Sequence, residues 1–81
     1  MRLFDYPQIV KKPMDLSTVK KNILKGKYQS YEDVFSDIQL VWGNCKTYNM
    51  SGSDIYLQAE AMERLSKKLI KQFKIQMGLA D

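Results

Sequence analysis

The sequence contains no histidine, one cysteine and no long hydrophobic run, and each absence excludes a class of function. Without histidine, and with Cys45 as the only thiol, the chain lacks the usual ligands of zinc and haem and the commonest general base. A lone cysteine cannot form an intramolecular disulfide, which favours a reducing intracellular compartment. No apolar run approaches the roughly 20 residues of a membrane-spanning helix, and the N-terminus lacks the apolar core of a signal peptide. We therefore expect a soluble intracellular protein with no membrane segment, metal or cofactor.

Glycine and proline are also scarce, with four and two residues respectively. Both prolines, Pro7 and Pro13, lie in the first 14 residues, which show no sustained apolar period and are predicted to form an irregular loop. The chain has 81 residues, of which 44% are hydrophobic and 27% charged, a composition typical of one small globular domain. Such a short domain buries only about 60% of the surface that its unfolded chain exposes, so we expect a thin core.

Hydrophobic periodicity predicts three helices after this loop. The first is expected at about residues 15–25, because Asp15 is a good N-cap, apolar residues recur at helical spacing, and Gly26 ends the pattern. The second is expected at about 30–48, where Ser30 begins a capping box completed by Asp33. Its apolar stripe consists of Val34, Phe35, Ile38, Val41, Trp42 and Cys45.

The third helix is predicted at about residues 54–77, after a turn that contains Gly52 and two serines. Ser53 or Asp54 can cap its start, and Gly78 provides a C-terminal stop. The face expected to point inward carries Ile55, Ala59, Met62, Leu65, Leu69, Ile70 and Phe73. The predicted fold class is all-α, with neighbouring helices antiparallel because short turns join them. The loop between the last two helices then lies at one end of the bundle, where a pocket can form.

The charges are distributed unevenly along the chain. Residues 1–27 hold seven basic and two acidic side chains, residues 28–62 hold one and five, and residues 63–81 hold five and two. The formal charges of these segments are therefore +5, −4 and +3, which sum to the net charge of +4. The acidic middle segment, which carries Glu32, Asp33, Asp37, Asp54 and Glu60, suggests attraction of a basic partner.

Several motifs together resemble one known family. They are Asp5-Tyr6, the run from Ile9 to Lys20 that contains Pro13-Met14-Asp15-Leu16, and then Phe35, Asp37, Asn44-Cys45, Tyr48-Asn49 and Ile55-Tyr56. In order and spacing they resemble the bromodomains, and the matches extend from about Leu3 to Phe73. The combination is far more specific than a single glycine or charge motif.

The resemblance implies a left-handed four-helix bundle that binds acetylated lysine, commonly on histone tails, and hence a nuclear location. By this resemblance Asn49 donates its amide hydrogens to the acetyl carbonyl, Tyr6 reaches the same oxygen through a water, and Ile55 is the gatekeeper beside the acetyl group. Tyr48, Cys45 and Leu3 match wall positions. Met50 is expected to border the pocket.

The match also has a gap, since the chain begins inside the loop that follows the family's first long helix. That helix and the Trp-Pro-Phe shelf have no counterpart here, and Trp42 lies within the apolar stripe of the second helix, which favours a core position. We therefore interpret residues 1–81 as a single partial domain of three helices. We expect the uncovered apolar surface to cause self-association or a loosened core, and the missing shelf to weaken binding.

Simpler interpretations accompany these assignments. Asn49 is also a common residue at helix C-termini, because asparagine tolerates left-handed backbone angles, and Tyr6 and Tyr48 also suit amphipathic packing. Cys45 on an apolar stripe fits a buried small hydrophobe rather than a nucleophile. The chain has no histidine, no phosphate-binding glycine loop and no convincing pair of carboxylates, so we expect no enzyme.

The main alternative function is a small basic helical module that contacts DNA phosphates. The residues that would serve it are Lys20, Lys21, Lys25 and Lys27 in the first half and Arg64, Lys67, Lys68, Lys71 and Lys74 in the second. No base-reading motif accompanies them. A purely structural dimerisation module is the other alternative.

Overall fold

The computed structural model describes residues 10–79, which form three α-helices and, within that range, no strand. Helix α2 spans Leu16–Leu24, α3 spans Tyr31–Tyr48 and α4 spans Asp54–Gln76. The predicted all-α fold is confirmed, and each predicted boundary lies within one residue of the observed one. Leu3 and Tyr6, two of the predicted site residues, lie outside the described residues.

The N-terminus of each helix is capped by a side chain that the sequence identifies. Asp15, Ser30 and Ser53 adopt extended backbone angles, and each side chain accepts a hydrogen bond from the backbone N–H three residues later. The donor–acceptor distances are 2.7, 3.4 and 3.3 Å respectively. These bonds satisfy N–H groups that have no partner within the helix, so they fix where each helix begins.

Helix α2 ends in a left-handed turn at Gly26, whose φ is 68°. The Gly26 N–H donates to the Ile23 carbonyl and the Lys27 N–H to the Asn22 carbonyl, both at 3.0 Å. This is the Schellman arrangement, which requires a residue that tolerates positive φ. The turn reverses the chain and lets α3 run antiparallel to α2.

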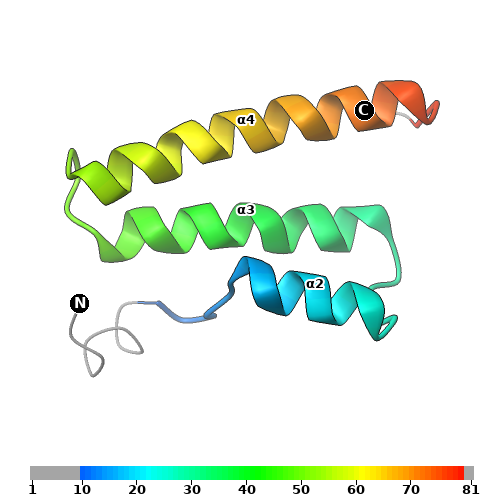
Figure 1. Ribbon diagram of the computed structural model, residues 1–81, viewed down its shortest axis with the longest axis horizontal. Coiled ribbons are helices and arrows are strands. Elements are labelled where there is room, and N and C mark those ends of the chain that lie inside the picture. Colours follow the sequence, from blue (N-terminus) through cyan, green and yellow to red (C-terminus); the bar gives the residue numbers. More distant parts are fainter. Residues whose placement is uncertain (1–9, 80–81) are drawn as a thin grey trace.

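Helix α3 lies between the other two helices (Figure 1). It contacts α2 on one side and α4 on the other, and α2 and α4 do not contact each other. The chain direction alternates from α2 to α3 to α4, as the short connections require (Figure 1). The core is therefore two helix–helix seams that share α3, not a single enclosed centre.

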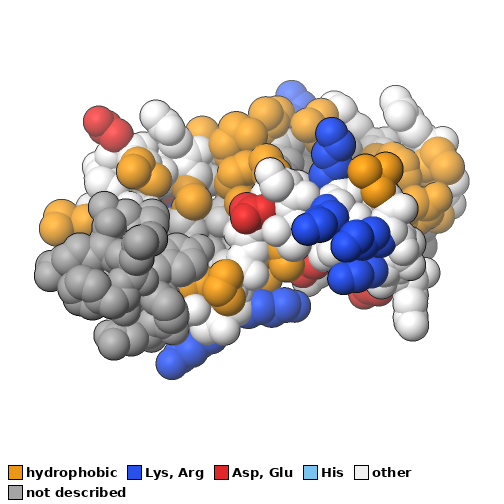
Figure 2. Space-filling view, turned by 60° about the horizontal axis from the view of Figure 1, so that its bottom comes forward, with side chains coloured by type: hydrophobic (Ala, Val, Ile, Leu, Met, Phe, Trp, Pro, Cys, Tyr) orange, Lys and Arg blue, Asp and Glu red, His pale blue; other side chains and the backbone are white. Residues whose placement is uncertain are grey.

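This arrangement produces a thin core of small side chains. Among the described residues the buried apolar side chains are Val10, Val19, Val41 and Ala59, and no large side chain is fully buried. Many hydrophobic side chains remain open at the surface (Figure 2). The thin core expected from chain length is thus observed.

The predicted inward face of α4 is partly wrong. Ala59 is buried, and Ile70 and Phe73 are half-buried, as expected. The other four members are exposed, with relative accessibilities of 53% for Ile55, 39% for Met62, 46% for Leu65 and 54% for Leu69. The reason is geometric: α4 packs against α3 alone, so only the strip of α4 that faces α3 is covered.

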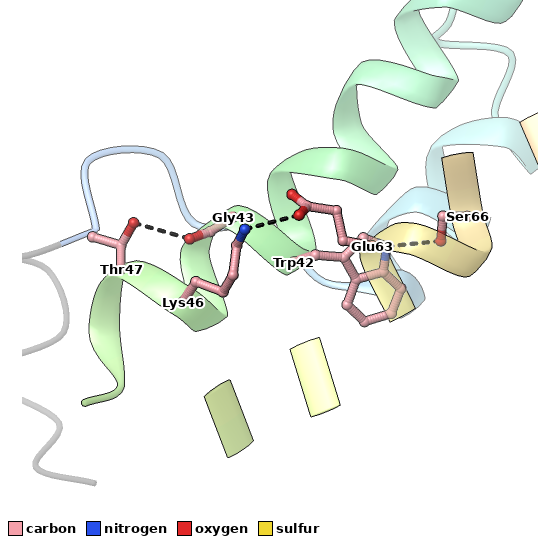
Figure 3. Close-up of polar contacts among 6 residues, drawn as sticks. All are labelled: Trp42, Gly43, Lys46, Thr47, Glu63 and Ser66. Atoms are coloured by element: carbon pink, nitrogen blue, oxygen red, sulfur yellow. Dashed lines mark hydrogen bonds and ion pairs between the residues drawn. The ribbon is translucent and has the colours of Figure 1, made fainter. Parts of the chain in front are cut away.

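Polar contacts join α3 to α4 along this seam (Figure 3). The Trp42 indole N–H donates to Ser66 Oγ at 2.9 Å, and Lys46 Nζ lies 2.8 Å from Glu63 Oε1. This position agrees with the expectation that Trp42 belongs to the helix packing. Nearer the start of α3, the rings of Tyr31 and Phe35 both meet Phe73 edge to face, with centroids 5.2 and 5.7 Å apart.

The loop before α2 is held against α3 by a buried amide. Asn44 is only 8% exposed, and its Nδ2 donates to the Lys12 carbonyl at 2.8 Å. Val10, two residues before Lys12 in the sequence, is also buried and is 2% exposed. Asp37 adds a second link, since it accepts a 2.8 Å hydrogen bond from the Tyr28 hydroxyl and lies 3.8 Å from Lys12 Nζ.

Replacing Gly43 by alanine is expected to stabilise the protein. Gly43 lies inside α3, where alanine is favoured over glycine by roughly 1 kcal/mol, and a Cβ added there meets no atom within 4 Å. The urea midpoint should therefore rise. Gly26→Ala is the matched control, because its φ of 68° strains any residue with a Cβ and should lower the midpoint. An unchanged or lower midpoint for Gly43→Ala would contradict this packing.

The Lys46–Glu63 pair should make stability depend on acid pH. The hydrogen bond from Lys46 holds the pKa of the Glu63 carboxyl below its ordinary value, against an opposing contribution from burial. A lowered folded-state pKa contributes stability above the unfolded value, and that stability is lost as pH falls through the folded value. Glu63→Gln should therefore be less stable than the parent chain at about pH 7, and its deficit should be smaller at about pH 3, where more of the parent carboxyl is protonated. Thermal unfolding at both pH values measures this, with Glu32→Gln as control; an equal deficit at both would contradict the assignment.

Candidate functional site

Four of the predicted site residues lie at or beside the connection between α3 and α4 (Figure 1). Cys45 and Tyr48 belong to the last turn of α3, and Asn49 is its C-terminal cap. Ile55 lies in the first turn of α4, after a connection that contains the left-handed Gly52, with φ of 84°. The predicted placement of these residues at one end of the helices is what the structure shows.

Asn49 is held by two hydrogen bonds to one carbonyl. Its backbone N–H donates to the Cys45 carbonyl at 3.1 Å, and its side-chain Nδ2 donates to the same oxygen at 2.8 Å. The second bond fixes the orientation of the side-chain amide. The other Nδ2 hydrogen and Oδ1 make no hydrogen bond to any other residue between 10 and 79.

Asn49 does lie at the C-terminus of α3, as its simpler interpretation expects, but not for the reason of left-handed backbone angles. Its backbone angles are φ −96° and ψ 150°, which is extended, and no non-glycine residue between 10 and 79 has positive φ. A tolerance for left-handed angles therefore does not account for asparagine here. What the position uses is the side-chain amide.

The neighbours of Asn49 offer apolar surface beside this amide. Ile55 is 53% exposed and Met50 is 81% exposed, so both side chains are open to an incoming ligand. Cys45 and Tyr48 are half-buried. An apolar side chain that is accessible next to an oriented amide is suited to a ligand with both an amide and a methyl group.

The structure does not describe the other two predicted pocket residues. Leu3 and Tyr6 lie outside the described residues, so the wall and the water-mediated contact assigned to them stay predictions. A hollow of about 750 Å³ lies elsewhere, near the turn between α2 and α3, with Tyr28 and Leu79 in its lining. It contains none of the predicted site residues.

The acidic middle segment divides in the structure. Glu32 and Asp33 occupy the first turn of α3, the end opposite Asn49, and at 1.5 Å per residue they lie about 25 Å away along the helix. That exceeds the screening length of roughly 8 Å at physiological salt. Only Asp54 and Glu60, near the start of α4, lie toward the Asn49 end. The proposed attraction of a basic partner therefore depends on two of the five acids.

Asn44 is a supporting residue to which the sequence analysis gave no role. Its buried amide ties the loop at Lys12 to α3 about one turn before Asn49. The signal was present, because Asn44 follows Val41 by three residues on the buried side of the helix, and a buried polar group requires a partner. The partner itself, a backbone carbonyl 32 residues away, has no sequence signature.

Residues 10–79 contain neither a metal-ligand cluster nor a candidate membrane-spanning helix. No group of three or more histidine, cysteine, aspartate or glutamate side chains there is placed to hold a metal ion. No helix of this part of the chain combines the length and the apolar character needed to cross a membrane.

Comparisons with known proteins agree with the sequence motifs. A family model described as Bromodomain matches residues 2–61. Transcription factor GTE2 of Arabidopsis thaliana is 48% identical over 73 residues, covering 90% of this chain and 11% of that protein. The chromatin structure-remodeling complex subunit rsc4 of Schizosaccharomyces pombe is 39% identical over 72 residues, covering 89% of this chain and 13% of the relative. The chain thus spans less than a fifth of either relative.

A solved structure is similar in both fold and sequence. It is the second bromodomain (BD2) from Candida albicans Bdf1 bound to an imidazopyridine, with a TM-score of 0.74 and 33% sequence identity. The match covers 79% of this chain and 60% of that chain.

Proposed function

Because the chain belongs to the bromodomain family, whose members are reader modules and generally non-catalytic, we propose that it binds acetylated lysine through Asn49. The observation that carries this proposal is the side-chain amide of Asn49, which one hydrogen bond to the Cys45 carbonyl orients while a second N–H stays available. An acetylated lysine offers that N–H one carbonyl acceptor. The assignment of Ile55 as gatekeeper and of Tyr48 and Cys45 as walls belongs to the same proposal.

Selectivity follows from the charge of the ligand. Acetylated lysine is neutral, with one amide and an apolar methyl and stem, and it can lie against Ile55 and Met50 while its carbonyl accepts from Asn49. Unmodified lysine would bring an ammonium group to a site that supplies no carboxylate partner from Cys45, Tyr48, Asn49 or Ile55. Desolvating an unpaired charge costs several kcal/mol, so the unmodified side chain should be rejected.

The partners we propose are acetylated protein tails, histone tails foremost, and the location we propose is the nucleus. The relatives support this, since they are named as a transcription factor and as a subunit of a chromatin structure-remodeling complex. Asp54 and Glu60 would favour basic tails by their charge. DNA contact through the lysines and self-association through exposed apolar surface remain predictions from the sequence.

The experiment is a calorimetric titration with pairs of histone-tail peptides that differ only in acetylation of one lysine. We expect weak saturable binding of acetylated peptides, because one neutral hydrogen bond contributes only about 0.5–1.5 kcal/mol net. Their unacetylated partners should not bind measurably. Equal binding of both members of each pair, or binding of neither to a chain shown to be folded by circular dichroism, would refute the proposal.

A further inference from the structure

A second candidate binding surface lies on the other half of the α3–α4 seam. A groove of about 500 Å³ runs between the two helices, and its lining comprises Glu32, Phe35, Ser36, Gln39, Lys67, Ile70, Lys71 and Lys74. We refer to it as the lysine-edged groove. Gln39 precedes Asn49 by ten residues, which is about 15 Å along α3, so this surface is separate from the acetyl-lysine site.

The floor of the lysine-edged groove is apolar. Phe35 and Ile70, both half-buried, also line an adjoining hollow of about 260 Å³ with Ile38, Ser66, Leu69 and Phe73. Leu69 is 54% exposed there. Phe35 and Ile70 thus lie in the seam between the two hollows, and they give the lysine-edged groove an apolar floor for side chains of a bound segment.

One edge of the lysine-edged groove carries positive charge. Lys67, Lys71 and Lys74 recur at spacings of four and three residues, which places them on one side of α4. None of the three forms an ion pair with a carboxylate in residues 10–79, where the salt bridges are those of Lys12 and Lys46. Glu32 is the one carboxylate of the lining, so three cations face a single anion across the groove.

Gln39 adds a polar feature to the floor. Both polar atoms of its side-chain amide are buried and have no hydrogen-bond partner in the described structure. Buried amides are normally paired, so a segment bound in the groove would relieve this arrangement once the Gln39 side chain rotates toward it. An amide is suited to the backbone N–H and C=O groups, or the polar side chains, of a peptide.

From these observations we propose that the lysine-edged groove binds an acidic amphipathic segment of a partner protein. Its apolar side chains would lie against Phe35 and Ile70, and its carboxylates beside Lys67 and Lys71, in the helix-in-groove mode. The apolar floor favours a peptide over nucleic acid, whose phosphates offer nothing to bury there. A second copy of the chain is disfavoured, because a symmetric contact would bring the lysine edges of both copies together.

The test is a selection of displayed random 16-residue peptides on the whole chain, followed by affinity measurement of the enriched sequences. The chain with Lys67→Glu and Lys71→Glu is compared with Lys68→Glu, which lies on the same helix but not in the groove lining. We expect enriched peptides that combine carboxylates with regularly spaced apolar residues. Their dissociation constants should rise at least tenfold in the double variant, and less than threefold in the Lys68→Glu control.

The nuclear magnetic resonance signal of the Gln39 side-chain amide tests whether the peptide binds in the lysine-edged groove. Addition of an enriched peptide should shift this signal while leaving that of Asn49 in place. The proposal is overturned if the enriched peptides are neutral or basic, if the double variant binds them as the parent does, or if Gln39 is unaffected. Tighter binding of duplex DNA than of any peptide, or self-association lost in the double variant, would assign the groove to another occupant. Because acetyl-lysine binding is read out separately, failure here leaves the Asn49 proposal standing.

Discussion

Replacing Asn49 by alanine should weaken binding of an acetylated peptide by roughly 5- to 140-fold. The side chain supplies an amide N–H that its hydrogen bond to the Cys45 carbonyl orients and that no other residue between 10 and 79 uses, and its removal leaves the acetyl carbonyl desolvated without a donor. An unpaired buried acceptor costs about 1–3 kcal/mol, and each 1.4 kcal/mol corresponds to a tenfold change in affinity. Calorimetric titration of the parent and variant chains with the same peptide measures the loss.

A second variant at this position separates chemistry from folding. Asn49→Asp keeps the shape but replaces both amide hydrogens by a carboxylate oxygen, so it should bind no better than Asn49→Ala. A negative charge at the C-terminus of α3 is also unfavourable by about 0.3–1 kcal/mol, and unfolding curves must accompany the titration. Ser51→Ala, in the same connection and exposed, is the matched control. Retention of parental affinity by folded Asn49→Ala would remove this residue from the site.

Replacing Trp42 by alanine should cause the largest loss of stability. Trp42 lies at the α3–α4 seam, and its indole N–H bonds to Ser66 at 2.9 Å. Removing a large aromatic side chain from a packed site costs about 3–5 kcal/mol, and partial exposure of Trp42 places the expectation near 3 kcal/mol. Small domains are stable by only about 5–15 kcal/mol, so the variant should approach unfolding at 37 °C.

The companion variant Trp42→Phe distinguishes packing from hydrogen bonding. Phenylalanine keeps most of the ring contacts but leaves Ser66 without its donor, so the loss should be about 1 kcal/mol. Urea unfolding followed by circular dichroism measures both variants, since Trp42 is the only tryptophan and its fluorescence disappears with it. A loss for Trp42→Ala no larger than that for Trp42→Phe would show that the ring does not hold the seam.

Features governed by local chemistry could be predicted from the sequence. Asp15, Ser30 and Ser53 were expected as helix N-caps, with Asp54 as an alternative to Ser53, and all three serve because capping depends on a side chain and the next three residues. The turn that connects α3 to α4 was predicted for the same reason. The family resemblance then identified Asn49, a residue whose local sequence alone suggests only a turn.

Features governed by distant contacts could not be predicted. The periodicity of α4 predicts a wide apolar face, but it does not reveal how many helices pack against that face. Because only α3 does so, Leu65 and Leu69 are exposed. The role of Asn44 depends on a carbonyl 32 residues away. The lysine-edged groove likewise joins residues from two helices, and from the sequence its lysines on α4 suggested only contact with DNA phosphates.

The most direct test of the central claim is the signal of the Asn49 side-chain amide in a nitrogen-labelled chain as peptide is added. If the chain reads acetylated lysine as proposed, an acetylated tail peptide should shift this signal to saturation, together with the backbone signals of Tyr48 and Ile55. The unacetylated peptide should leave all three unchanged. Saturable binding of the acetylated peptide with no change at Asn49 would place the ligand elsewhere and contradict the account.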